Sequence, residues 1–166
     1  MKRGTVVLGT VVLGTLGALL LPGAEGGCRG DREVEVAVVR GGAQCGGEGE
    51  DPSARRLASA DELAGAFASE LGVELPALDF AKDAVVLVAA GRKPTAGFGV
   101  DLAAPKAAAK GGVAALQVRL TRPDPAALVA QLVTSPCLVV RLAREGLTEI
   151  QVIDWDKEAI ASVGLR

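Results

Sequence analysis

The chain has 166 residues, with 18 basic and 20 acidic side chains, a formal net charge of −2 and no histidine. A near-neutral chain without a basic stripe is not expected to bind nucleic acid, and its four aromatic residues offer no platform for stacked bases. The lack of histidine excludes Ser-His-Asp and Cys-His catalysis and HExxH zinc sites. We therefore expect a protein that is not an enzyme and that holds neither a cofactor nor a metal ion.

Residues 1–26 have the pattern of a secretory signal peptide. Lys2 and Arg3 precede the apolar run 6–21, and Pro22 follows it. This run of about 16 residues is shorter than the roughly 20 that a membrane span needs. We expect export to the periplasm, the envelope surface or the medium, with an uncleaved signal anchor as the alternative.

The three cysteines suggest one special thiol and one pair. An odd count in an exported chain is typical of this division. Cys28 lies just after the signal and is a candidate for lipidation, although Glu25 is unsuited to a lipobox and ordinary cleavage is an equal alternative. Cys45 and Cys137 are predicted to form a disulfide. The alternative is two separate thiols, with Cys137 filling a core position.

The first part of the expected domain has few regular elements. Residues 27–33 are polar and glycine-rich and read as a tether, and 34–39 alternate as a strand does. Residues 40–57 are rich in glycine and acidic side chains, which predicts a long loop. A helix is expected over 59–71, because Ser59 with a glutamate three residues later forms a capping box before an apolar stripe.

The stretch 79–102 organises the rest of the chain. An uninterrupted apolar run, 84–90, is followed by the turn-forming loop 91–97 and then by alternation over 98–102. This pattern predicts a buried strand and a half-buried strand joined as a β-hairpin.

The later segments complete an α+β, mainly antiparallel fold of about six strands, sandwich-like, with one amphipathic helix. The globular domain is expected over 34–154. The remaining expectations are a mildly helical 104–112, a strand at 113–120, a helix or a strand at 126–134, a second hairpin from 137–142 and 148–153, and a tail at 155–166 that is frayed or briefly helical.

The loop at residues 91–98 carries the most chemistry. Two adjacent cations occupy its expected tip, a proline restrains the backbone, and glycines leave room for a partner strand to approach. The candidate partner-binding residues are Gly91, Arg92, Lys93, Pro94, Thr95, Gly97 and Phe98.

The chain resembles the C-terminal domain of the PrcB-like family of protease-complex subunits over residues 57–153. The family's lead-in, apolar strand and G-x-K-x-T-G-G-Y loop match 78–98, where Ala96 and Phe98 replace the second glycine and the tyrosine. Its late T-x-P segment matches Thr134-Ser135-Pro136, and Cys137 stands where an aromatic often follows.

The resemblance implies an exported binding protein, in some relatives a lipoprotein, that associates with and stabilises a protease. Contact with the membrane would then occur only through an N-terminal lipid or an uncleaved signal. Two alternatives remain open. The Pro-Thr-x-Gly-Phe loop is also similar to that of chagasin-type cysteine-protease inhibitors, and a structural envelope domain without a specific ligand would have the same composition.

Overall fold

The computed structural model describes residues 31–45, 47, 49–69 and 74–166, so the predicted signal peptide and Cys28 lie outside it. No helix in these ranges is both long and apolar enough to cross a membrane. The elements, in chain order, are β1 Arg32–Gly42, β2 Ser53–Leu57, α1 Ala60–Ala66, β3 Asp83–Ala89, β4 Gly99–Leu102, β5 Lys106–Lys110, β6 Val113–Thr121, β7 Cys137–Ala143, β8 Glu149–Ile153 and β9 Ala159–Gly164.

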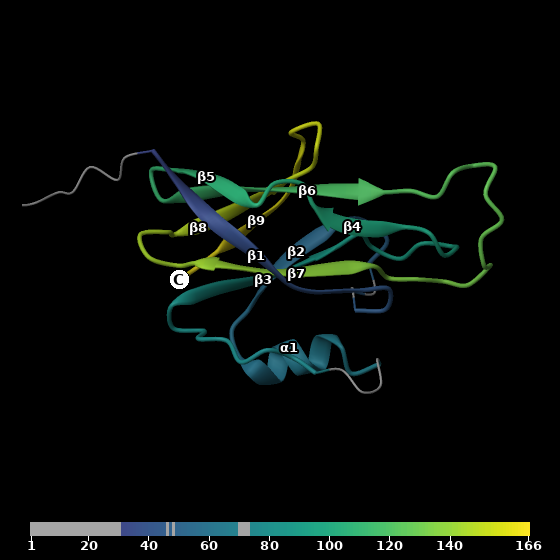
Figure 1. The fold of residues 1–166 in the computed structure, drawn as a ribbon, viewed down its shortest axis with the longest axis horizontal. Coiled ribbons are helices and arrows are strands. Elements are labelled where there is room, and N and C mark those ends of the chain that lie inside the picture. The colour runs from purple at the N-terminus through teal and green to yellow at the C-terminus, as the bar shows by residue number, and fades with distance from the viewer. Residues whose placement is uncertain (1–30, 46, 48, 70–73) are drawn as a thin grey trace, which may run out of the picture.

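All the strands belong to one sheet, which curls into a nearly closed barrel (Figure 1). The strand order is β2-β3-β7-β1-β5-β6-β8-β9, with β4 beside β6. The end strands β2 and β9 lie next to each other, and the Arg56 guanidinium is 3.4 Å from the carbonyl oxygens of Leu165 and Arg166. The predicted class, mainly antiparallel β with one helix, is confirmed, but the prediction of a six-stranded sandwich is wrong.

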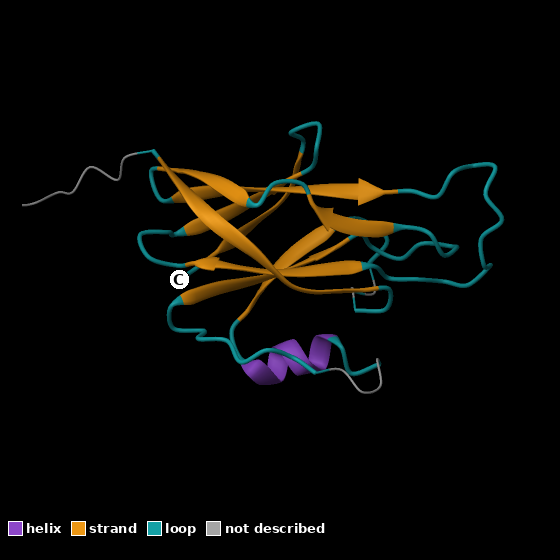
Figure 2. Ribbon diagram, in the orientation of Figure 1, coloured by secondary structure: helices purple, strands orange, loops and turns teal. Residues whose placement is uncertain are grey.

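Strand β3 is buried on both faces, which explains its uninterrupted apolar sequence. Val86 and Val88 face the barrel core, while Val85 and Leu87 belong to an outer cluster. Helix α1 covers this outer face of the strands (Figure 2). The two clusters therefore place β3 in the middle of the molecule.

Helix α1 begins where the capping box predicts. The Ser59 hydroxyl accepts a hydrogen bond from the Glu62 N–H at 3.2 Å, and the Glu62 carboxylate accepts one from the Ala58 N–H at 3.0 Å. The buried side chain of Leu63 fixes the helix on the outer cluster. The helix ends at Ala66, earlier than predicted.

The predicted hairpin of residues 79–102 does not form. β3 pairs with β2 and β7, whereas β4 pairs with β6. The predicted second hairpin is also wrong, because β7 pairs with β1 and β3, and β8 runs parallel to β6. A strand that is buried on both faces in mid-sheet takes a neighbour on each edge. Those neighbours come from distant parts of the chain.

Three strands lie where none was predicted. β2 lies in the expected long loop, β5 in the expected helical connection and β9 in the expected tail, and β1 already begins within the expected tether. The β5–β6 turn consists of Gly111 and Gly112, with φ values of 60° and 91°. Positive φ at both central residues suits a two-residue hairpin, which explains why an alanine-rich segment pairs as a strand here.

Candidate functional site

The loop 91–98 joins β3 to β4 at one end of the barrel, which we call the mouth end. The β1–β2 and β6–β7 connections also run to this end, on the right in Figure 1. The loop therefore lies between two other connections instead of projecting as the tip of a hairpin.

Gly91 fixes the loop against the β1–β2 connection. Its φ is +79°, and a Cβ at this position would lie 2.2 Å from the Glu50 carbonyl oxygen. The next N–H, of Arg92, donates to the Gly49 carbonyl at 2.8 Å. Only glycine combines this backbone conformation with so close an approach, so the glycine of the predicted motif has a structural role.

The middle of the loop pairs with the β6–β7 connection. Lys93 and Thr134 exchange two backbone hydrogen bonds of 2.8 and 2.9 Å. The buried Thr134 hydroxyl donates to the Thr95 carbonyl at 3.0 Å, and the Ala96 N–H donates to the Ala130 carbonyl at 3.0 Å. These bonds tie residues 93–96 to the second segment of the predicted family pattern.

The far end of the loop is packed just as closely. A Cβ on Gly97, where φ is +90°, would lie 2.8 Å from the Cβ of Pro123. Gly99 lies opposite Thr121 in the β4–β6 ladder, and a Cβ there would lie 2.7 Å from the Thr121 hydroxyl oxygen. Glycine at these two positions therefore allows close packing against Pro123 and Thr121.

The exposed part of the loop is smaller than predicted. Arg92, Pro94 and Gly97 are exposed, whereas Lys93 and Phe98 are half-buried. The Lys93 ammonium donates to the Glu50 carbonyl at 3.3 Å. Of the two predicted cations, Arg92 therefore remains the more available for a partner.

Apolar side chains on the β6–β7 connection were missed as site residues. Leu128 is fully exposed, and Leu132 and Val133 are about half-exposed. The segment 126–134 is neither the helix nor the strand that its sequence allowed. A signal was present, since leucine and valine stand between two proline-rich turns without helical or strand periodicity. We call the set Arg92, Pro94, Gly97, Leu128, Leu132 and Val133 the mouth surface.

A pocket of about 310 Å³ opens beside the loop. Its apolar lining comes from Pro52, Ala90, Phe98 and Leu120. The other lining residues are polar or charged, namely Glu50, Asp51, Lys93, Thr121 and Arg122. Phe98 is thus part of a pocket wall.

Cys45 and Cys137 form a disulfide, as the sequence predicts, with a Cα–Cα distance of 5.6 Å. Both residues are buried in the outer cluster beside α1. The bond joins the β1–β2 connection to the start of β7. Nearby, the Ser135 N–H donates to the Ala43 carbonyl at 2.9 Å and the Ser135 hydroxyl to the Gly47 carbonyl at 2.9 Å.

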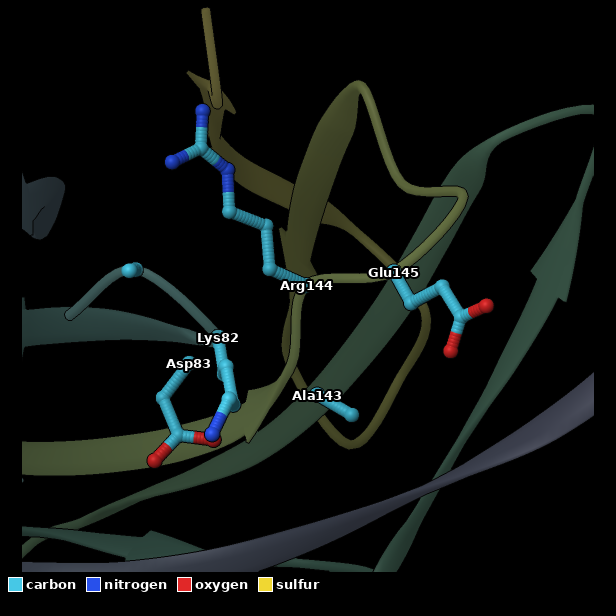
Figure 3. Close-up of a pocket in the computed structure, with 6 residues that line it drawn as sticks. Lys82, Asp83, Ala143, Arg144 and Glu145 are labelled. Atoms are coloured by element: carbon cyan, nitrogen blue, oxygen red, sulfur yellow. The ribbon is translucent and has the colours of Figure 1, made fainter. Parts of the chain in front are cut away.

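A second pocket, of about 600 Å³, lies at the opposite end of the barrel, between the start of β3 and the end of β7 (Figure 3). In Figure 3 the side chains of Arg144 and Glu145 point away from each other. The Arg144 guanidinium donates to the Leu165 carbonyl, and Asp83 pairs with Arg141 at 3.5 Å. The charges of Arg144 and Asp83 are thus engaged in structural contacts.

Beside this second pocket, Lys82 pairs with Asp79 at 3.2 Å. The hydrogen bond from the Lys82 ammonium is the largest cause that lowers the pKa of the Asp79 carboxyl, and the backbone N–H of Ala81 adds to it. The described ranges contain no group of three side chains able to hold a metal ion.

No curated protein and no solved structure matches the chain. A family model, described as PrcB C-terminal, matches residues 84–143. The matched segment runs from β3 to the end of β7 and contains both the 91–98 loop and the β6–β7 connection. The predicted resemblance is confirmed, and the chain contains a PrcB-like C-terminal domain over these residues.

Proposed function

We propose that this chain is an exported, non-enzymatic domain that binds a protein partner through the mouth surface. The observation that carries the proposal is the full exposure of Leu128 beside a loop held by backbone hydrogen bonds. Leucine and valine on an ordered surface mark an interaction site, because their burial by a partner is favourable.

Part of the mouth surface is already fixed in place before a partner binds, and this favours tight binding. Residues 93–96 and 130–134 are already fixed to each other by backbone hydrogen bonds, so little further ordering is needed when a partner binds. Arg92 supplies an exposed cation at the edge of the apolar side chains. Arginine and large apolar residues are frequent in the energetic centres of protein interfaces.

Export is supported by two independent features. Lys2 and Arg3 precede an apolar run with the length of a signal peptide. The Cys45–Cys137 disulfide suits an oxidising compartment. Lipidation at Cys28 stays a prediction, since this residue lies outside the described ranges.

The family resemblance suggests a protease as the partner. The matched segment carries every residue of the mouth surface. The chagasin-type alternative has weaker support, because the 91–98 loop lies against two neighbouring connections instead of projecting on its own. The structural-domain alternative predicts that the mouth surface binds nothing.

The test compares a variant of the mouth surface with a control variant elsewhere on the protein surface. Leu128→Ser combined with Arg92→Glu alters the mouth surface, whereas Val38→Ser removes a half-exposed apolar side chain of β1. Each protein is used to capture partners from an envelope extract, and the captured partner is then purified and its affinity measured.

We expect the mouth variant to lose at least about tenfold in affinity, because a partner no longer buries the Leu128 side chain. Val38→Ser should bind as the wild type does. Equal affinities for all three proteins would refute the proposal. If the partner is a protease, its half-life with and without this chain distinguishes stabilisation from inhibition.

A further inference from the structure

Strand β6 has one unoccupied edge at the mouth end. On one side it pairs first with β5 and then with β4. On its other side it pairs with β8, and this parallel register ends at Gln117 opposite Ile153. Beyond that point no described strand pairs with the second edge of β6.

The backbone of Leu120 faces this unoccupied edge. The Ala103 N–H donates to the Gln117 carbonyl at 3.0 Å, which directs the hydrogen-bonding groups of Gln117 and of alternate residues after it toward β4. Leu120 belongs to the opposite set. Within the described part of the chain, neither its N–H nor its carbonyl has a hydrogen-bond partner.

The pocket of about 310 Å³ lies along this edge. Leu120, Thr121 and Arg122 line one side of it, and residues 50–52, which precede β2, line the other. The wall of the barrel is therefore open between β6 and β2 at the mouth end. Ala90 and Phe98 give the opening an apolar lining.

We propose that this opening binds an extended segment of a partner polypeptide, which pairs with β6 at Leu120 and places one apolar side chain in the pocket. The proposal rests on the proposed function and names the form in which the partner is recognised. A free donor and a free acceptor on one residue of a strand edge match the backbone of another strand. The adjacent apolar lining suits a large aliphatic or aromatic side chain.

The charged residues that line the pocket indicate which partner residues can flank the bound apolar side chain. Lys93 and Arg122 lie on the same pocket as Glu50 and Asp51, so residues of either sign can flank the apolar side chain. The edge is short, because Pro123 follows Arg122 and has no N–H. The paired part of the partner is therefore short, and its apolar side chain contributes much of the affinity.

The experiment uses a phage-displayed library of random linear peptides, selected on the wild-type protein. Enriched peptides are expected to share one large apolar residue. Amide hydrogen exchange of the wild-type protein is then measured with and without the best peptide. We expect exchange of the Leu120 N–H to slow by about tenfold or more in the complex, because this N–H gains an acceptor.

Two variants isolate the backbone contribution. Leu120→Ala keeps the N–H and removes most of the side chain, whereas Leu120→Pro also removes the N–H without deleting a hydrogen bond to β4. We expect Leu120→Pro to bind the peptide about tenfold more weakly than Leu120→Ala, the value of one hydrogen bond. Thermal unfolding of both variants checks that each is folded.

Two results would overturn the inference and leave the proposed function standing. In one, no peptide is enriched although the mouth-surface variant still loses its partner. In the other, peptides bind and depend on Leu128 or Arg92, but the Leu120 amide exchanges at the same rate in the complex. A wild-type protein that binds neither peptides nor a partner would refute both proposals.

Discussion

The two ends of the barrel differ in the apolar side chains that their connections expose, although the connections at both ends are held by backbone hydrogen bonds. At the mouth end, the β1–β2, β3–β4 and β6–β7 connections form backbone hydrogen bonds with one another, such as the Lys93–Thr134 pair. At the opposite end, the Thr148 N–H donates to the Gly112 carbonyl in the β5–β6 turn, and the Arg144 N–H donates to the Lys82 carbonyl, each at 2.8 Å. The β6–β7 connection at the mouth end carries three of the exposed large apolar side chains among the described residues, Leu128, Leu132 and Val133.

This contrast separates stability from binding. The connections at the opposite end are held by backbone hydrogen bonds and expose none of the large apolar side chains found exposed among the described residues. The mouth end has long connections that are fixed in place, yet Leu128 stays exposed. A connection that is ordered without burying its apolar side chains is better explained by a partner than by folding.

The largest expected difference between the ends concerns the disulfide. Cys45→Ser with Cys137→Ser opens a covalent loop with a sequence separation of 92. We expect the free energy of unfolding to fall by about 3 to 4 kcal/mol, measured by denaturant titration. Amide exchange should rise at residues 91–97 more than at the β5–β6 turn, and a uniform rise would show that the disulfide does not act mainly on the mouth end.

A matched pair of glycine substitutions compares the ends directly. Gly91→Ala combines positive φ with a clash against the Glu50 carbonyl, whereas Gly111→Ala, at φ +60°, meets no atom within 4 Å. We expect Gly111→Ala to cost about 1 kcal/mol of stability, from backbone strain alone, and Gly91→Ala at least about 2 kcal/mol. Chemical unfolding of both variants gives the comparison, and equal losses would show that the Glu50 contact is unimportant.

The smallest expected effect concerns a surface carboxylate at the opposite end. The Lys82 hydrogen bond holds the pKa of Asp79 below its ordinary value of 3.8. The folded state is therefore favoured by this group above that value, and the contribution disappears as the pH falls through the lowered pKa. It is small, because both side chains are exposed.

An NMR titration of the Asp79 carboxyl tests the assignment. In Lys82→Met its pKa should rise toward the ordinary value. Lys110→Met, which removes a cation that pairs with Asp31, serves as the control and should leave the Asp79 titration unchanged. An unaltered Asp79 titration in Lys82→Met would assign the shift to the backbone N–H groups instead.

Local sequence patterns predicted the positions of individual helices and strands better than they predicted which strands pair. The apolar run of β3 and the capping box at Ser59 are local signals, and both features lie where expected. The odd number of cysteines also led to the prediction of the Cys45–Cys137 disulfide. Strand pairing was mispredicted because it depends on which surfaces are buried together, and this information is distributed over the whole chain.

Strands β2 and β5 were missed because their amino-acid composition is not typical of strands. β2 has two arginines in five residues, and β5 is Lys-Ala-Ala-Ala-Lys, a sequence with high helix propensity. Both become strands because neighbours in the barrel offer hydrogen bonds. The same limit applies to the site. The sequence indicated the 91–98 loop, but not that the β6–β7 connection lies beside it and presents Leu128.

The parallel pairing of β6 with β8 makes the order of folding events predictable. Between β6 and β8 the chain crosses to the other side of the barrel, forms β7 between β3 and β1, and then returns. Contacts of such large sequence separation are slow to form. The final strand, β9, also has to arrive before the seam with β2 can close. Synthesis of β9 must therefore precede closure of the barrel.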